Sequence, residues 1–153
     1  MTIIDLPDES ATAAFAARVA AVALPGDVIA LSGELGAGKT SFARAFIRAR
    51  GGSGEVPSPT FTLVQLYDLP VAPIWHFDLY RLRGPDEAWE LGIEDAFRDG
   101  ISLIEWPERL GSLLPIRRLR IALDFCPAPV ARRVTLSAGD EWSARIADIA
   151  AEA

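Results

Sequence analysis

The stretch VIALSGELGAGKTSF, residues 28–42, constrains the fold of this chain more than any other. It begins with an apolar run that is typical of a buried central strand. Gly33–Thr40 then matches the pattern G-x-x-x-x-G-K-[ST], in which a glycine-rich turn leads directly into a helix. The sequence therefore predicts an α/β domain with a phosphate-binding corner between a strand and a helix.

Each residue type in this loop suits the binding of phosphate groups. Glycines allow a tight turn and let backbone N–H groups approach phosphate oxygens. Lys39 is the only lysine among 15 basic residues, and a guanidinium is no simple replacement for an ammonium that reaches the outer phosphates. The threonine hydroxyl can bind Mg²⁺. We expect ATP or ADP to be bound by Gly33, Gly36, Ala37, Gly38, Lys39, Thr40 and Ser41.

Length and composition narrow the class of protein. A chain of 153 residues has the length of one domain, so we expect residues 1–153 to form a single P-loop ATPase domain. The net charge of −6 argues against general affinity for nucleic acid. One cysteine, Cys126, rules out an intrachain disulfide, and we expect it in the core. The acidic N-terminus and the lack of a long apolar run predict a cytoplasmic protein with no membrane association.

Apolar runs and turn residues predict the other elements. Residues 60–68 and 74–81 read as strands that are separated by only five residues, which favours an antiparallel hairpin over a crossover helix. Residues 101–106 predict a buried strand that ends in an acid. Further strands are expected at 2–6, 118–125 and 132–138, and helices after Asp8 or Ser10, after the glycine-rich loop, around Gly92 and over 140–153. The expected fold is a P-loop NTPase-like α/β domain with a mixed central sheet and an antiparallel hairpin, flanked by helices.

Two acids and one threonine are candidates to complete the phosphate site. A P-loop needs a carboxylate for the water shell of its metal, usually at the end of a neighbouring strand. Glu105 ends one such strand and Asp78 lies in the predicted hairpin. We assign Glu105 to the metal and Asp78 either to the attacking water or to the outer water shell of the metal, although the residues alone leave the exchange of these roles open. Thr60 could contact the γ-phosphate or the metal, whereas the lone His76 is expected to be structural or a local hydrogen-bonding group.

Four motifs together resemble one family of bacterial P-loop ATPases. These motifs, in order, are GELGAGKTSF, VPSPTFTLVQLY, HFDLYRL and LIEWPERLG, with ELGIEDAF between the last two. Their order and spacing are similar to those of the TsaE (YjeE) family. The resemblance implies a role in forming threonylcarbamoyladenosine on tRNA next to the anticodon. It implies that the chain hydrolyses ATP beside a TsaD-like transferase and a TsaB-like partner subunit, without transferring the group itself and with only indirect contact to tRNA.

The resemblance also implies roles for individual residues. Thr40 and Glu105 would bind Mg²⁺, while Lys39, Asp78 and Thr60 would form the reaction centre. Glu9 would lie near the nucleotide base by a looser analogy. Beyond residue 115 the resemblance fades, so it implies no base or ribose contact there.

Two alternatives compete with this interpretation. A stand-alone P-loop kinase of a small molecule would need an acceptor pocket and a mobile lid that carries arginine, for which a chain of this length has little room. A guanine-nucleotide switch would need an N-K-x-D motif, but the sequence contains no asparagine. An ATP-dependent assembly switch stays open, because it would need nucleotide binding but no hydrolysis.

Overall fold

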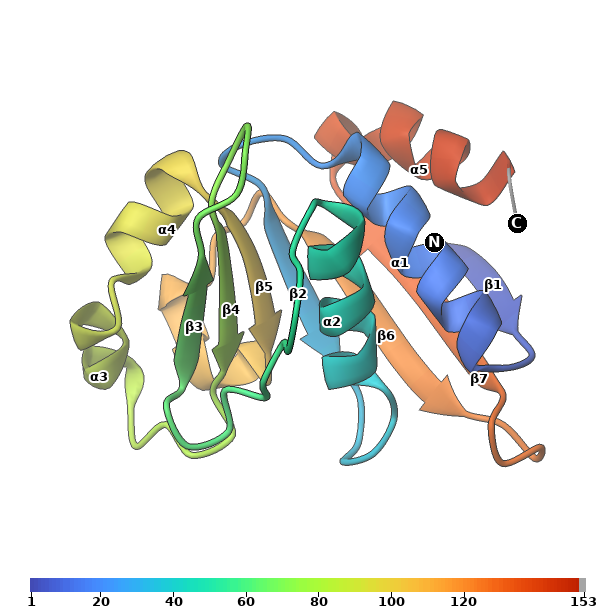
Figure 1. Cartoon of the computed structure of the whole chain (residues 1–153), viewed down its shortest axis with the longest axis horizontal. Helices are drawn as coiled ribbons and strands as arrows, with labels where there is room; N and C mark the ends of the chain where they lie inside the picture. The colour runs from blue at the N-terminus through green and yellow to red at the C-terminus, as the bar shows by residue number, and fades with distance from the viewer. Residues whose placement is uncertain (152–153) are drawn as a thin grey trace.

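The computed structural model describes residues 1–151. Within these residues, seven strands form one mixed sheet in the order β1-β7-β6-β2-β5-β4-β3 (Figure 1). The strands are β1 (Thr2–Leu6), β2 (Val28–Ser32), β3 (Val64–Tyr67), β4 (Ile74–Asp78), β5 (Ile101–Glu105), β6 (Leu119–Phe125) and β7 (Arg132–Ala138). The predicted α/β fold with a mixed sheet is confirmed.

Helices pack on both faces of this sheet and form two separate cores. One core holds apolar residues of α1, α2 and α5, and the other holds residues of α3, α4 and the 3-10 segment η1. The helical segments are α1 (Glu9–Val22), α2 (Lys39–Ala49), α3 (Pro85–Glu90), α4 (Ile93–Asp99), η1 (Pro107–Leu113), η2 (Asp140–Trp142) and α5 (Ser143–Ala151). The terminal helix was predicted over 140–153, of which residues 152 and 153 lie outside the described part.

The strands β2, β4 and β5 run parallel to one another, so their carboxyl ends meet at one edge of the sheet. β2 pairs with β5, and β5 pairs with β4. This edge is the lower one in Figure 1, where the loop between β2 and α2 also lies. The register places Asp78 directly beside Glu105. The two predicted acids are therefore brought to the phosphate loop by ordinary parallel pairing.

The predicted hairpin is present, but its strands are shorter than expected. β3 and β4 pair antiparallel, with Val64 opposite Phe77. Residues 60–63 form turns, where Leu63 adopts the left-handed conformation (φ 67°). The chain thus bends between Pro59 and β3, and this bend directs Thr60 toward Asp78 at the end of β4 instead of along a strand.

Part of the sheet is covered on one face only. The strands β1, β6 and β7 contribute no buried residue to the second core within the described chain. Their residues alternate between buried and exposed, as in β6, where Leu119 and Ile121 are buried while Arg120 is exposed. This alternation is typical of an antiparallel sheet with one face in water.

Two smaller expectations meet different outcomes. Cys126 follows β6 and is half-buried, so the expectation of a core position is wrong. None of the described helices has the length and apolar character that a membrane crossing requires.

Candidate nucleotide-binding site

The phosphate loop depends on glycines at positions that other residues adopt with strain. Gly33, Gly36 and Gly38 have φ values of 149°, 81° and 106°. A Cβ atom on Gly33 would lie 2.7 Å from the carbonyl oxygen of Leu123 in β6. Gly38 directly precedes α2, whose first residue is Lys39. The local sequence thus creates a loop whose backbone curls over the amino end of a helix, which is a favourable place for an anion.

Lys39 is held inside this loop. Its Nζ atom donates hydrogen bonds to the carbonyl oxygens of Gly33 at 2.5 Å and Glu34 at 2.9 Å. The same atom lies 4.2 Å from the centre of the Trp106 ring. Burial lowers the pKa of Lys39, and the carboxylates of Glu105, Asp78 and Glu108 oppose this shift. The carbonyl oxygens that contact Nζ carry no net charge. A bound phosphate group would give the ammonium a negatively charged hydrogen-bond partner.

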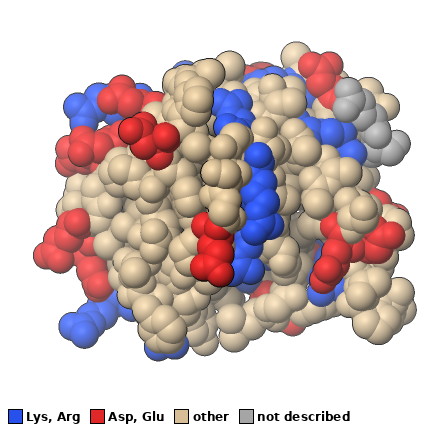
Figure 2. Space-filling model, viewed as in Figure 1, with Lys and Arg blue, Asp and Glu red and all other residues tan. Residues whose placement is uncertain are grey.

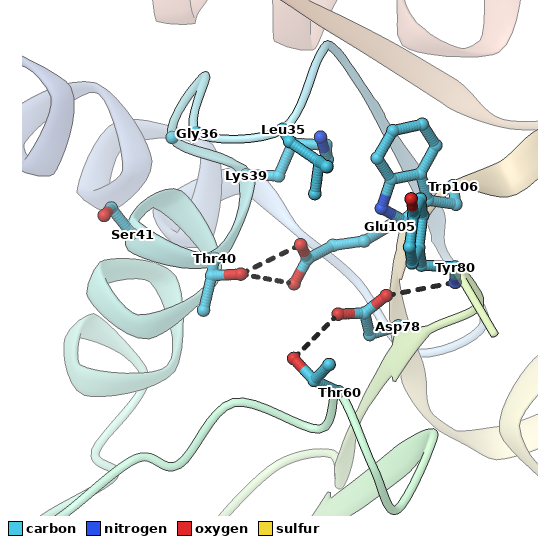
Figure 3. Close-up of a pocket in the computed structure, with 11 residues that line it drawn as sticks. Leu35, Gly36, Lys39, Thr40, Ser41, Thr60, Asp78, Tyr80, Glu105 and Trp106 are labelled. Atoms are coloured by element: carbon cyan, nitrogen blue, oxygen red, sulfur yellow. Dashed lines mark hydrogen bonds between the residues drawn. The ribbon is translucent and has the colours of Figure 1, made fainter.

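The hydroxyl of Thr40 meets the carboxylate of Glu105. Thr40 Oγ1 lies 2.9 Å from Oε1 and 3.0 Å from Oε2 of Glu105, and Figure 3 shows the two side chains facing each other. Glu105 is only 2% exposed and also contacts Nε2 of His76 at 2.7 Å. The predicted pair of metal ligands is therefore brought together by α2 and β5.

Asp78 forms a second group beside the first. Its Oδ2 accepts a hydrogen bond from Thr60 Oγ1 at 3.3 Å, and Thr60 in turn contacts Ser58 Oγ at 2.7 Å. The other oxygen of Asp78 accepts the backbone N–H of Tyr80 at 3.1 Å (Figure 3). Asp78 is thus fixed on both sides, with Thr60 held against it by the bend before β3.

These groups line one cavity of about 230 Å³ at the carboxyl edge of the sheet. Figure 3 shows Thr40, Glu105, Asp78 and Thr60 pointing toward a common space, with Lys39 above them. The lining residues are Leu35, Gly36, Gly38, Lys39, Thr40, Ser41, Thr60, Asp78, Tyr80, Glu105 and Trp106. Tyr80 and Trp106 are further lining residues, and the centres of their rings lie 5.0 Å apart, a packing contact that depends on tertiary structure and has no local signal in the sequence.

A second cavity of about 530 Å³ adjoins the phosphate loop on the side of α1. Gly36, Gly38 and Ser41 line both cavities. Glu9, the first residue of α1, lies on the wall of this second cavity together with Arg44, Arg48 and Arg132. Figure 2 shows a narrow band of basic side chains over α2 on an otherwise mixed surface.

The structure separates the predicted loop residues by position. Ala37 packs its methyl group in the core, so only its backbone can face a ligand. Gly33 lines neither cavity and serves as an acceptor for Lys39. Arg132 of β7 is a residue that sequence reasoning missed, and its Nε donates to the carbonyl of Ala37 at 3.0 Å. Nothing local in the sequence predicts this contact, because it spans 95 residues.

The oxygen atoms in the first cavity fit Mg²⁺ better than a metal that needs many protein ligands. Mg²⁺ is commonly held by one or two protein oxygens together with substrate phosphates and water. Thr40 and Glu105 supply such oxygens side by side. The described residues contain no group of three or more histidine, cysteine, aspartate or glutamate side chains that could hold a metal.

Comparison with known proteins agrees with this geometry. The family model of "Threonylcarbamoyl adenosine biosynthesis protein TsaE" matches residues 6–133 of the chain. This chain belongs to the TsaE family. A TsaE protein of Rickettsia bellii is 42% identical over 119 residues, covering 77% of this chain and 83% of the relative. A TsaE protein of Bacillus subtilis is 42% identical over 118 residues, covering 76% and 72%. Both are named tRNA threonylcarbamoyladenosine biosynthesis proteins.

A solved structure shows that the likeness extends to the fold of the whole domain. The crystal structure of Bacillus subtilis YdiB superposes with a TM-score of 0.80 at 30% sequence identity. The match covers 99% of this chain and 95% of YdiB. The resemblance was expected to fade beyond residue 115, but the family model continues to residue 133 and the structural match covers nearly the whole chain.

Proposed function

We propose that this chain binds ATP with Mg²⁺ and hydrolyses it as a subunit needed for threonylcarbamoyladenosine modification of tRNA. The observation that carries the proposal is the contact of Thr40 with Glu105 at the foot of the phosphate loop. A nucleotide-binding loop without such a pair would hold phosphates but would lack a place for the metal. Membership of the TsaE family supports the biological role.

The chain's own residues suit this chemistry in separate ways. Lys39 would move from the carbonyls of Gly33 and Glu34 to the outer phosphate oxygens and so offset their charge. Thr40 and Glu105 would hold Mg²⁺, and the bound ion would polarise the phosphoryl oxygens. Thr40 donates its hydrogen to Glu105 and keeps its oxygen lone pairs for a cation.

The separate contacts of the two acids favour one of the two assignments left open by the sequence. Glu105 contacts the phosphate-loop hydroxyl of Thr40, whereas Asp78, its neighbour in the sheet, contacts Thr60 instead. We therefore assign Asp78, with Thr60, to orienting the attacking water, a task that nucleotide hydrolysis gives to a separate positioning residue beside the metal ligands.

The second cavity suits the rest of the nucleotide. It meets the first at Gly36, Gly38 and Ser41, so a ligand with its phosphates on the loop can extend into it. Glu9 would face the base, and Arg44 and Arg48 would favour an anionic ligand despite the negative net charge of the chain.

Hydrolysis by the isolated chain should be slow. Lys39 is the only basic residue among the described residues that line the first cavity. Efficient phosphoryl transfer usually uses an additional arginine, often supplied by a partner. We propose that a TsaD-like transferase and a TsaB-like subunit complete or order the site, that tRNA contact is indirect, and that the complex acts in the cytoplasm.

ATP binding and hydrolysis by the wild type and Lys39→Ala test this proposal. We expect slow hydrolysis by the wild type, faster hydrolysis with both partner subunits present, and a large loss in Lys39→Ala. Arg120→Ala, on the uncovered face of β6, is the matched loss of a basic side chain and should behave as the wild type. Unchanged ATP affinity and hydrolysis in Lys39→Ala would refute the site, and phosphate transfer to a metabolite instead of water would favour a kinase.

A further inference from the structure

His76 is the only histidine of the chain, is buried, and contacts Glu105, the proposed metal ligand. It lies in β4, its side chain is 0% exposed, and the sequence contains no other histidine. The β4–β5 register places His76 opposite Leu103, so its ring reaches along the sheet to Glu105 two residues further on. The distance from His76 Nε2 to Glu105 Oε2 is 2.7 Å.

The chemistry of the two groups fixes the direction of this hydrogen bond. An ionised carboxylate can only accept hydrogen bonds, so Nε2 of His76 must carry the hydrogen that lies between them. The other ring nitrogen, Nδ1, is buried and has no hydrogen-bond partner within the described chain. A hydrogen on Nδ1 would therefore be buried without an acceptor, which agrees with the same tautomer.

His76 and Thr40 hold Glu105 from different elements. Thr40 belongs to α2 and lines the cavity, whereas His76 belongs to β4 and is fully buried behind the carboxylate. Glu105 is the last residue of β5, where a side chain with a single donor could rotate about its terminal bonds. Two donors on separate elements restrict that rotation.

We propose that His76 is a positioning residue that fixes the Glu105 carboxylate for Mg²⁺. The inference rests on the proposed function, in which Glu105 holds the metal. Mg²⁺ demands nearly ideal octahedral geometry, so it is sensitive to the orientation of a ligating carboxylate. Donors behind a ligand commonly change metal affinity by about 10- to 100-fold when they are removed. His76 touches no part of either cavity and acts through Glu105 alone.

The tautomer can be measured directly in the unmodified protein. Because the chain has one histidine, nitrogen-15 labelling of histidine yields a single imidazole spectrum without assignment. We expect the hydrogen of the ring to lie on Nε2, and we expect the Nε2 chemical shift to change in Glu105→Gln. A ring that carries its hydrogen on Nδ1 would overturn the proposal without reference to metal or nucleotide.

Two amide variants separate positioning from packing. The amide nitrogen of glutamine reaches about as far as Nε2 of histidine, whereas asparagine is one methylene shorter. Titration of Mg²⁺ into each protein bound to a non-hydrolysable ATP analogue should show an affinity about 10- to 100-fold weaker in His76→Asn. His76→Gln should retain most of the wild-type affinity. Nucleotide affinity in the presence of a chelator should be equal in all three proteins.

A double-mutant cycle that combines His76→Asn with Glu105→Gln completes the test. In that background, His76→Asn should no longer weaken Mg²⁺ binding, because the group that it positions has changed. Equal losses in His76→Gln and His76→Asn, or an equal loss with and without Glu105, would show a structural role only and overturn the proposal. Failure of the proposed function is a distinct result, in which the wild type itself binds nucleotide equally well with and without Mg²⁺.

Discussion

The two halves of the sheet differ in their cover. Helices cover both faces of the half formed by β2, β5 and β4 (the covered half), whereas one face of the half formed by β1, β7 and β6 meets water (the open half). In β5, all five residues are buried, since helices cover both faces of the sheet there. In β7, buried Val134 and Leu136 alternate with more exposed neighbours, since one face meets water. The cavity with Thr40, Asp78 and Glu105 lies wholly at the covered half. The β1–β7–β6 half instead anchors the phosphate loop from the side, through Arg132 and the close approach of Leu123 to Gly33.

This difference explains why the site lies at the carboxyl edge of the covered half. Parallel strands deliver their carboxyl ends to one edge, so β2, β4 and β5 bring a loop and two acids together without special turns. Cover on both faces then excludes water from Glu105 and His76 and makes their contacts strong. In the open half, β7 runs antiparallel to β1 and β6, so carboxyl ends of strands lie at both edges of the sheet, and polar side chains on the open face meet solvent.

The largest effect is expected from opening a cavity in the core beneath α1 and α2. Phe42 of α2 is fully buried and its ring lies 5.6 Å from that of Phe15 in α1. Phe42→Ala should lower the free energy of unfolding by about 3–5 kcal/mol. Thr135→Ala, on the open face of β7, should change it by less than about 0.5 kcal/mol. Chemical denaturation measures both, and similar losses in the two variants would contradict the contrast between this core and the open face of β7.

Two aspartates near strand ends allow a matched test of the effect of a lost carboxylate on ATP hydrolysis. Asp78 ends β4 in the cavity, whereas Asp124 lies near the end of β6 and is exposed. Asp78→Asn should lower kcat for ATP hydrolysis by about 100-fold or more, because it removes the group that we propose orients the attacking water. Asp124→Asn should leave kcat unchanged. Steady-state kinetics decides, and an unaffected Asp78→Asn would remove Asp78 from the reaction centre.

The sequence predicts the local parts of the site and misses the long-range ones. The loop from Gly33 to Thr40 is visible because its strand, turn and helix are consecutive in the chain. Glu105 and Asp78 are found because an acid after an apolar run indicates a strand end. The contact of His76 with Glu105 and that of Arg132 with Ala37 span 29 and 95 residues. Such contacts depend on strand order, which a single sequence does not state.

Strand boundaries and burial show the same limit. Residues 60–63 look like the start of a strand by composition, yet the chain turns over residues 60–62 to present Thr60 to Asp78, and only Leu63 hydrogen-bonds with β4. Cys126 was expected in the core because cysteine is usually buried, but it follows the exposed end of the open half. Tertiary context overrides residue preference at both places.

A smaller effect is expected where the two halves touch. Gly33→Ala would place its Cβ 2.7 Å from the Leu123 carbonyl at a φ that alanine rarely adopts. It should cost about 1–3 kcal/mol of stability and also weaken ATP binding, since the strand end and loop must shift. Gly51→Ala also has a positive φ but meets nothing within 4 Å. It should reduce stability alone, so equal ATP affinities in the two variants would contradict a role for the Leu123 contact.

The smallest effect concerns the proton on Lys39. Burial lowers its pKa in the free protein, and a bound triphosphate would raise the pKa again. Between the lowered pKa and the ordinary lysine value, ATP binding should therefore take up as much as one proton, and affinity should fall as pH rises through this window. Calorimetry in buffers of different ionisation enthalpy measures the uptake. Its absence in the wild type, or its persistence in Lys39→Ala, would contradict the assignment.

The role proposed for this chain is ATP hydrolysis at the covered half in support of repeated tRNA modification. Its most direct test is reconstitution with a TsaD-like transferase, a TsaB-like subunit and tRNA, counting threonylcarbamoyladenosine formed per complex over several turnovers. We predict many rounds with the wild-type chain and an early stop with Glu105→Ala, in which ATP hydrolysis is lost. Repeated modification by a Glu105→Ala protein that no longer hydrolyses ATP would contradict the claim and show that nucleotide binding alone suffices.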